Sequence, residues 1–143
     1  MTLTKALKQK NRLTQKMSDI QQEIQRENSV RADDSRKIDV GNLMANLFKT
    51  RNDLIRLKIA IFVASTSMRE NILVLGELKS HIIFLRGIST REGFISDYGD
   101  KEIKYTVVFD KLYIKTEIED CEKQIDNIQD KLDTFNHKTE VII

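Results

Sequence analysis

The sequence contains no proline and no tryptophan, and it has only one cysteine, two histidines and five glycines. Because proline is the strongest helix breaker, its absence favours long uninterrupted helices. The single cysteine cannot form a disulfide within the chain, which favours a reducing compartment. The longest apolar run, IAIFVA at 59–64, is far shorter than the roughly 20 residues that cross a bilayer. The N-terminal segment MTLTKALKQKNRLTQK also lacks the apolar core of a secretory signal. We therefore expect a cytoplasmic protein with no membrane partner.

Motifs for catalysis and for binding nucleotides or metals are missing as well. The chain has no GxGxxG, GxxxxGKS/T, GxSxG, HExxH, CxxC or EF-hand pattern. Neither His81 nor His137 has a second metal-binding side chain at helical spacing in an apolar setting. A group of acids near the start of the last predicted helix is better explained as a solvated face, because a helix N-terminus favours negative charge. These acids are Glu117, Glu119, Asp120 and Glu122. We expect no enzyme activity, no cofactor and no catalytic or metal site.

What the sequence does contain is two seams of apolar residues at coiled-coil spacing, one at each end of the chain. Their members alternate steps of three and four, the heptad repeat of a helix that packs on a partner helix. Cys121 lies in the second seam, so we expect it to pack rather than react. Lys10 is a polar member of the first seam, where such a residue can fix the register. The two seams consist of Leu3, Ala6, Lys10, Leu13, Met17, Ile20 and Ile24, and of Ile114, Ile118, Cys121, Ile125, Ile128, Leu132 and Phe135.

The net charge of +2 conceals opposite charges at the two ends of the chain. Residues 1–37 hold nine lysines and arginines against five acids, and residues 110–143 hold five against nine. Because charges beside a seam select the partner helix, we expect the first and last helices to lie side by side, within one chain or between chains. The first helix carries a basic patch whose cations are spread around it, so we favour such pairing over a nucleic-acid partner. The basic patch consists of Lys5, Lys8, Arg12 and Lys16.

Local signals predict a mainly α fold, an elongated antiparallel bundle or coiled coil of four helices with a β-hairpin inserted before the last helix. Thr2 or Thr4 is expected to cap the first helix, and Asp39 the second. Ser67 and Glu70 match a capping box for the third helix, after a break at Thr66. The predicted helices span residues 2–28, 40–65, 67–86 and 111–136, within a single domain over residues 1–143.

Between the third and fourth helices the apolar period changes to two, which is the spacing of a β-strand. Gly99-Asp100 separates the run Phe94–Tyr98 from a second run that ends at Phe109. In this second run, Ile103, Tyr105, Val107 and Phe109 alternate with other residues and point to one side. We therefore predict a hairpin over residues 93–109. An isolated hairpin is only marginally stable, so we expect it to pack on the bundle or on another copy.

The second predicted helix has the broadest apolar surface. Because this surface exceeds a two-stranded seam, we expect the helix to be buried against more than one neighbour. The third helix continues with a single stripe of apolar residues, ended by Gly87. In the second helix one face holds Leu43, Leu47, Leu54, Leu57 and Ile61, and beside it lie Met44, Phe48, Ile55, Ile59 and Phe62. The stripe of the third helix consists of Met68, Ile72, Leu75, Leu78, Ile82 and Leu85.

Several segments resemble a family of small bacterial helical proteins of unknown function that is called septicolysin-like. The opening TLTKALKQKNRL resembles the family's LxxALxxRxxL helix, GDKEIKYTVVFD its EIK segment after the third helix, and LDTFNHKT its closing LDxxIQxxNWxT. The chain departs from the pattern at His137, where the family has tryptophan, and over residues 66–92. The resemblance implies an elongated helical bundle that assembles into a homo-oligomer, with a hexamer among the expected forms. Pore formation is not carried over, because the chain shows no membrane-inserting segment.

These patterns favour a non-enzymatic, self-assembling coiled-coil protein that serves as a structural or interaction scaffold and has itself as partner. A chaperone or adaptor resembling prefoldin is an alternative, because long terminal helices separated by a hairpin are that family's plan. A nucleic-acid-binding protein that uses the basic first helix is a further alternative.

Overall fold

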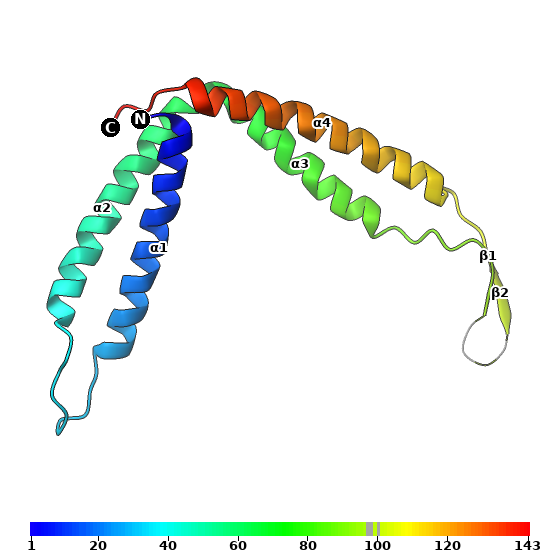
Figure 1. The fold of residues 1–143 in the computed structure, drawn as a ribbon. Coiled ribbons are helices and arrows are strands. Elements are labelled where there is room, and N and C mark those ends of the chain that lie inside the picture. Colours follow the sequence, from blue (N-terminus) through cyan, green and yellow to red (C-terminus); the bar gives the residue numbers. More distant parts are fainter. Residues whose placement is uncertain (97–98, 100) are drawn as a thin grey trace. The chain divides into compact units, whose positions relative to one another are not determined.

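The computed structural model describes residues 1–96, 99 and 101–143. Within them the chain forms four α-helices and one two-stranded antiparallel sheet (Figure 1). This confirms the prediction of a mainly α fold with a hairpin before the last helix. The elements are α1 Leu3–Glu27, α2 Val40–Ala64, the 3-10 turn η1 Thr66–Met68, α3 Arg69–Arg86, β1 Gly93–Ser96, β2 Glu102–Tyr105 and α4 Lys111–Lys138.

The chain divides into two compact units, and we describe each by itself. Unit 1 comprises residues 1–67 and 134–143, and unit 2 comprises residues 68–133. Helix α4 therefore contributes its last residues to unit 1 and the others to unit 2. Each unit has its own cluster of buried apolar side chains.

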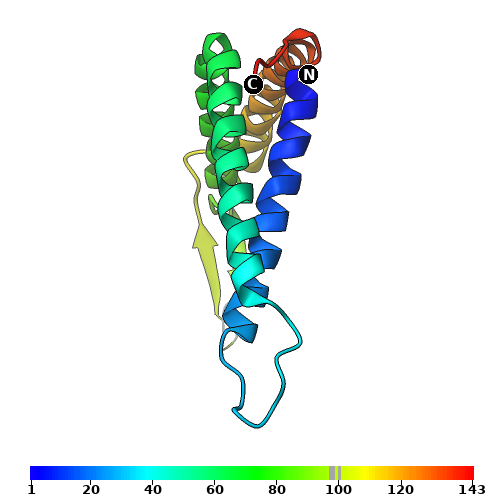
Figure 2. The same cartoon turned by 90° about the vertical axis from the view of Figure 1, so that its left-hand side faces the viewer.

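Unit 1 is built on an antiparallel pair of helices, α1 and α2, joined by residues 28–39 (Figure 2). Both helices begin at the predicted caps. The backbone N–H of Lys5 donates to Thr2 Oγ1 at 3.4 Å, and that of Asn42 donates to Asp39 Oδ1 at 3.0 Å. These side-chain acceptors satisfy backbone donors that a helix start leaves without a partner.

The other helix ends of unit 1 are also closed by side chains. Arg36 donates from its guanidinium to the carbonyl oxygens of Glu27 and Asn28, both at 3.1 Å, and so ties the connection to the end of α1. At the end of α2, Ser65 Oγ donates to the carbonyl oxygen of Ile61 at 2.8 Å, and Thr66 Oγ1 donates to that of Val63 at 3.0 Å. The carbonyl of Ile61 also accepts from the backbone N–H of Ser65 at 2.9 Å, so the hydroxyls add side-chain donors to the last carbonyls of the helix.

The break at Thr66 is thus confirmed, but the predicted capping box is wrong. Helix α3 begins at Arg69 instead of Ser67, and its N-cap position is Met68, which makes no side-chain capping bond. Ser67 lies within the turn η1, so it does not have the extended backbone of a helix cap. The end of α3 at Arg86, before Gly87, agrees with the prediction.

The core of unit 1 joins the two helices to the C-terminal segment. Leu3, Ala6, Leu57 and Val141 form the buried cluster, and Phe135 packs against it. Backbone hydrogen bonds fix this arrangement: Leu3 N–H donates to the carbonyl of Thr139, and Val141 N–H donates to that of Met1, both at 2.8 Å. The two ends of the chain accordingly lie close together (Figure 1).

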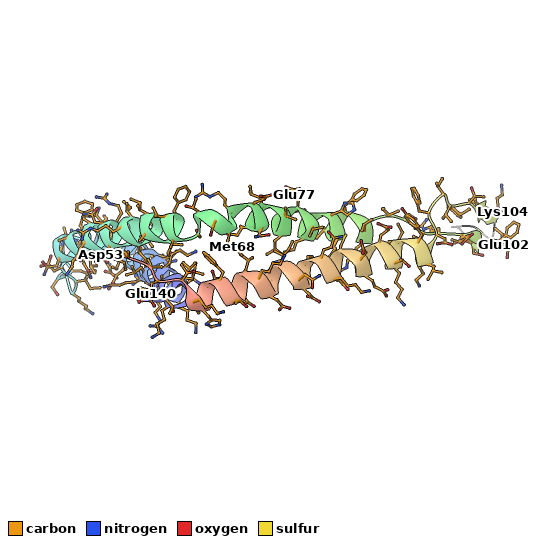
Figure 3. All side chains as sticks on the ribbon, turned by 90° about the horizontal axis from the view of Figure 1, so that it is seen from above. Asp53, Met68, Glu77, Glu102, Lys104 and Glu140 are labelled. Carbon is orange, nitrogen blue, oxygen red and sulfur yellow. The ribbon has the colours of Figure 1, made fainter. Side chains whose placement is uncertain are left out.

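Unit 2 is built on α3 and the larger part of α4. Ile82 and Leu85 of α3 pack with Ile114 and Cys121 of α4 in the second buried cluster. Arg86 and Glu122 add an exposed ion pair of 3.5 Å between the two helices. Glu77 points away from α4 and marks the solvent-facing side of α3 (Figure 3).

The hairpin is shorter than predicted. β1 and β2 pair in register from Gly93 with Tyr105 to Ser96 with Glu102, and the ladder ends there. The prediction that β2 continues to Phe109 is wrong, because β1 begins at Gly93 and offers no further partner. Phe109 instead stacks on Tyr113, with ring centroids 4.8 Å apart. Tyr98 and Asp100 of the predicted hairpin lie outside the described residues.

The cluster of unit 2 gives a first prediction. Leu85→Ala should lower the free energy of unfolding by about 2–5 kcal/mol, because it leaves a cavity among packed side chains. Leu112→Ala, at an exposed position of α4 in the same unit, is the matched control and should change it by less than about 0.5 kcal/mol. Urea unfolding followed by circular dichroism measures both. Equal effects of the two substitutions would contradict the described packing.

Candidate interaction surfaces

Helix α2 divides its apolar surface between two sides. The side toward α1 includes Leu54 and Leu57, which are each 3% exposed. The other side, which we call the outer stripe, stays open to solvent, with Phe48 and Ile55 each 48% exposed. At 3.6 residues per turn, the side chains of this stripe fall within an arc of roughly 60°. The outer stripe consists of Met44, Phe48, Ile55, Ile59 and Phe62.

The structure therefore corrects the expectation that α2 is buried against more than one neighbour. The first predicted face is covered, whereas the residues beside it are exposed. The largest contiguous apolar patch on a typical monomeric protein covers about 300–600 Å² and often marks a functional surface. The outer stripe is the strongest candidate for an interaction surface in unit 1.

A hollow adjoins the outer stripe near the end of α2. Its volume is about 540 Å³, and its walls are mainly apolar. Ile59 and Val63 line it from α2, and Ile142 and Ile143 line it from the C-terminal segment. Among the described residues that line it, Arg56 and Glu140 have charged side chains. The hollow continues the apolar surface of the outer stripe toward the C-terminal segment. Its described lining residues do not form a set of polar groups that converge on a ligand.

Helix α3 has a second exposed apolar surface, in unit 2. Leu73 is 67% exposed and Phe84 is 62% exposed, and Ile72 and Ile83 lie with them on the side away from the buried cluster. The predicted stripe of this helix is thus wrong at Ile72, because that residue faces solvent while Leu75, Ile82 and Leu85 are buried. His81 is also exposed, with its ring centroid 5.7 Å from that of Phe84.

Buried members of the terminal seams take part in both apolar clusters. Leu3 and Ala6 of α1 lie against Leu57 of α2, and Ile114 and Cys121 of α4 lie against α3. These parts of the seams face α2 and α3, whereas Phe135 of α4 packs on the cluster that contains Leu3 and Ala6 of α1. Within one chain the predicted contact between the first and last helices is thus limited to these ends, and their pairing between chains stays a prediction. Of the seam residues, Leu3, Ala6, Ile20, Ile114, Cys121 and Leu132 are buried, and Lys10, Leu13, Met17, Ile24, Ile118, Ile125, Ile128 and Phe135 are half-buried.

The basic patch of α1 is exposed and more regular than expected. Lys5, Lys8, Arg12 and Lys16 follow at steps of three, four and four, which places them within an arc of roughly 80° on one face. Lys10, a fifth cation of this segment, lies in the seam. Among the ion pairs of the described residues, none involves these four cations. These four cations therefore form a basic stripe on one face of α1, and Lys10 lies on another face.

Cys121 and the histidines are the described side chains that need attention for chemical reactivity. Cys121 is buried, and burial raises the pKa of its thiol, with smaller contributions from the negative charges of Asp120 and Glu117. A raised pKa leaves little thiolate near neutral pH, which is the opposite of an activated nucleophile. His137 lies in the last turn of α4. Among the described residues, no group of three or more His, Cys, Asp or Glu side chains is arranged to hold a metal ion.

The helices were also compared with the requirements of a membrane span. In the part of the chain that the structure describes, no single helix is long and apolar enough to cross a bilayer. Two consecutive helical segments, 40–64 and 66–86, meet the requirement together by length and composition, with a bend at the break between them.

Comparisons with known proteins give no relative from which a role for these surfaces can be inferred. No family model, no curated protein and no solved structure matches the chain.

The position of Cys121 gives a second prediction. In the folded chain at pH 8, its thiol should react with Ellman's reagent at least about tenfold more slowly than in urea, because burial both excludes the reagent and raises the thiol pKa. As a control, Lys115→Cys adds an exposed thiol to the same helix, and it should react at a similar rate in both conditions. Fast labelling of native Cys121 would show that the cluster around it opens readily.

Proposed function

We propose that the protein is a non-enzymatic, self-assembling helical protein that acts as a structural or interaction scaffold. The observation that carries this proposal is the outer stripe of α2, an apolar surface with coiled-coil spacing that unit 1 leaves exposed. The exposed surface of α3 supports it, since it provides a second area for contacts. The resemblance to the septicolysin-like family points to the same kind of assembly.

The size of the outer stripe is suited to a contact between chains. Its five side chains are between 37% and 59% exposed. Each partner contributes about 800 Å² to a standard interface, so the contact would also take in residues beside the stripe. Covering such a surface is favourable because apolar area is removed from water. Aromatic residues such as Phe48 are also enriched among the side chains that carry most of the binding energy at interfaces.

This proposal predicts that assembly depends on the outer stripe. The unaltered chain should have a mass that is a multiple of the monomer mass in size-exclusion chromatography with light scattering at micromolar concentration. Ile55→Glu should reduce the mass to that of a monomer, because it places a charge in the centre of the buried contact. Helix content by circular dichroism should stay unchanged, since Ile55 does not contribute to the core of unit 1.

Asn11→Glu is the matched control for this experiment. It introduces the same charge at an exposed position of α1, and the assembly should persist. A compact monomer of the unaltered chain at micromolar concentration would contradict the proposal. An assembly that persists in the Ile55→Glu variant would show that the contact lies on another surface.

The basic stripe of α1 favours one second candidate, binding of nucleic acid. Four exposed cations on one helix face span about 17 Å, a distance that covers several phosphates of a duplex. Because such binding releases counterions, the logarithm of the affinity for a 20-base-pair DNA duplex should fall with the logarithm of salt concentration, with a slope of about −3 to −4.

Substitutions in the basic stripe test this candidate. Lys8→Gln together with Arg12→Gln should weaken binding and reduce the slope by about two, because two phosphate contacts are lost. Lys101→Gln with Lys104→Gln on the hairpin is the control with equal charge change, and it should leave the slope unchanged. Fluorescence anisotropy at several salt concentrations provides the measurement. An affinity that does not respond to salt would exclude this function.

A further inference from the structure

We propose that the charged face of α1 docks on the charged face of α4 of a second copy of this chain, with the two helices antiparallel. This inference rests on the proposed self-assembly and adds a second contact to it, with the residues that meet there and their direction. The contact does not involve the outer stripe. The occupant of the basic stripe is thus an α4 helix, and nucleic acid is an outcome of the test below.

The exposed face of α4 carries an acidic stripe that matches the basic stripe of α1. Its members follow at steps of three, four and four, the same steps as the four cations, and they fall within an arc of roughly 80°. The acidic stripe consists of Glu119, Glu122, Asp126 and Asp130, which are all exposed. Two helices with opposite charges at the same spacing can place each charge of one beside a charge of the other.

Each charged face also changes sign along its helix. On α1 the basic stripe is followed on the same face by Asp19 and Glu23. On α4 the acidic stripe is preceded on the same face by Lys111 and Lys115. Both faces therefore run from basic to acidic along the chain, so the order of charge distinguishes the two directions in which the helices can pair.

An antiparallel pair matches the two orders of charge. If Lys16 is level with Glu119, each of the six charges on the α1 face comes level, within one residue, with an opposite charge on α4. Opposite charges at facing positions of two helices select the partner and its orientation. The pairs are Lys5 with Asp130, Lys8 with Asp126, Arg12 with Glu122, Lys16 with Glu119, Asp19 with Lys115, and Glu23 with Lys111.

One cation of α4 departs from this pattern. Lys123 lies at the edge of the acidic stripe, about 60° around the helix from Asp126, and comes level with Arg12. Because Arg12 also has Glu122 opposite it, Lys123 weakens one of the six pairs and leaves the others as they are.

A parallel pair fits less well. With Lys5 level with Glu119, the four cations still meet the four acids, but Asp19 comes level with Asp133. The two lysines that precede the acidic stripe then meet no acid of α1. Like charges at facing positions repel each other, so the order of charge favours the antiparallel direction.

The charges of both faces are available for a second copy. Glu119 pairs with Lys115 at 3.9 Å within its own helix, and Glu122 pairs with Arg86 at 3.5 Å, both in exposed positions. Exposed ion pairs are weak, so these carboxylates can be shared with another copy. For the same reason the new contact orients the copies and speeds their encounter, while apolar surface holds them together. Among the described residues, no ion pair involves Lys5, Lys8, Asp126 or Asp130.

Charge reversal tests this contact. One variant carries Lys5→Glu with Lys8→Glu, and another carries Asp126→Lys with Asp130→Lys. Each alone should associate at least about tenfold more weakly than the unaltered chain at about 50 mM salt, because like charges then meet with little screening. Lys101→Glu with Lys104→Glu on the hairpin is the control with the charge change of the first variant, and it should leave association unchanged. Sedimentation velocity over a range of concentrations measures association.

Two combinations show which helices meet and in which direction. In an equal mixture of the two reversed variants, the intact α1 of one chain can pair with the intact α4 of the other, so hetero-association should return. A single chain with all four substitutions should recover association to within about threefold, because each new acid is level with a new cation in the antiparallel pair. In a parallel pair the altered and unaltered charges of the two stripes would all face like charges.

Crosslinking of the unaltered chain with a carbodiimide reads the direction without any substitution. In a mixture of labelled and unlabelled copies, links between copies should join Lys5 to Asp130 and Lys16 to Glu119. Links from Lys5 to Glu119 and from Lys16 to Asp130 would overturn the antiparallel direction, as would loss of association in the chain with all four substitutions. This measurement decides the direction even where a reversed chain loses helix content.

The outcomes separate this contact from the proposed function. If neither reversal changes association while light scattering shows an assembly, the contact is wrong and the proposed function stands. Salt-dependent binding of DNA in that case would assign the basic stripe to nucleic acid. A monomeric unaltered chain would overturn both.

Discussion

The structure of unit 1 depends on how the broad apolar surface of α2 is divided. Packing against α1 buries Leu54 and Leu57, and this contact fixes the rotation of α2 about its own axis. Because the positions of a helix are rigidly related at 3.6 residues per turn, the same rotation turns Phe48 and Ile55 toward solvent. No choice of side-chain rotamer can bury both sides against a single neighbour. The exposed stripe is therefore a consequence of the core, and covering it requires another surface.

Sequence periodicity predicted which faces of the terminal helices are buried, but it did not predict their partners. A heptad repeat identifies a face, since Leu3 and Cys121 lie on one by spacing alone. The choice of partner was inferred from opposite net charges, and exposed ion pairs contribute only about 0.2–1 kcal/mol each. The packing of Leu57 on α1 and of Ile82 on α4 removes more apolar area from water than such pairs can offset. Apolar surface thus decided the pairing within each unit.

Features that depend on neighbouring residues were predicted better than features that depend on distant ones. Asp39 and Thr66 mark helix ends through hydrogen bonds to residues at most four positions away, so the sequence nearby is sufficient. The end of β2 at Tyr105 depends on a distant residue, because it is set by where β1 begins. The capping box at Ser67 is a local signal that failed, because Ser67 lies within the turn η1. The residues of the outer stripe were recognised as apolar from the sequence alone. Their exposure was not, because it depends on how many neighbours α2 has.

The position of charge relative to the outer stripe explains how such a surface can be specific. An apolar stripe without charges would pack on many surfaces, since apolar contacts have little directional preference. Arg51 and Lys58 of α2 lie along one edge of the outer stripe and are exposed. They restrict the partners, because any helix that covers this edge has to present uncharged or acidic side chains there. The same two cations that lower the apolar content of the stripe thereby restrict what it can bind.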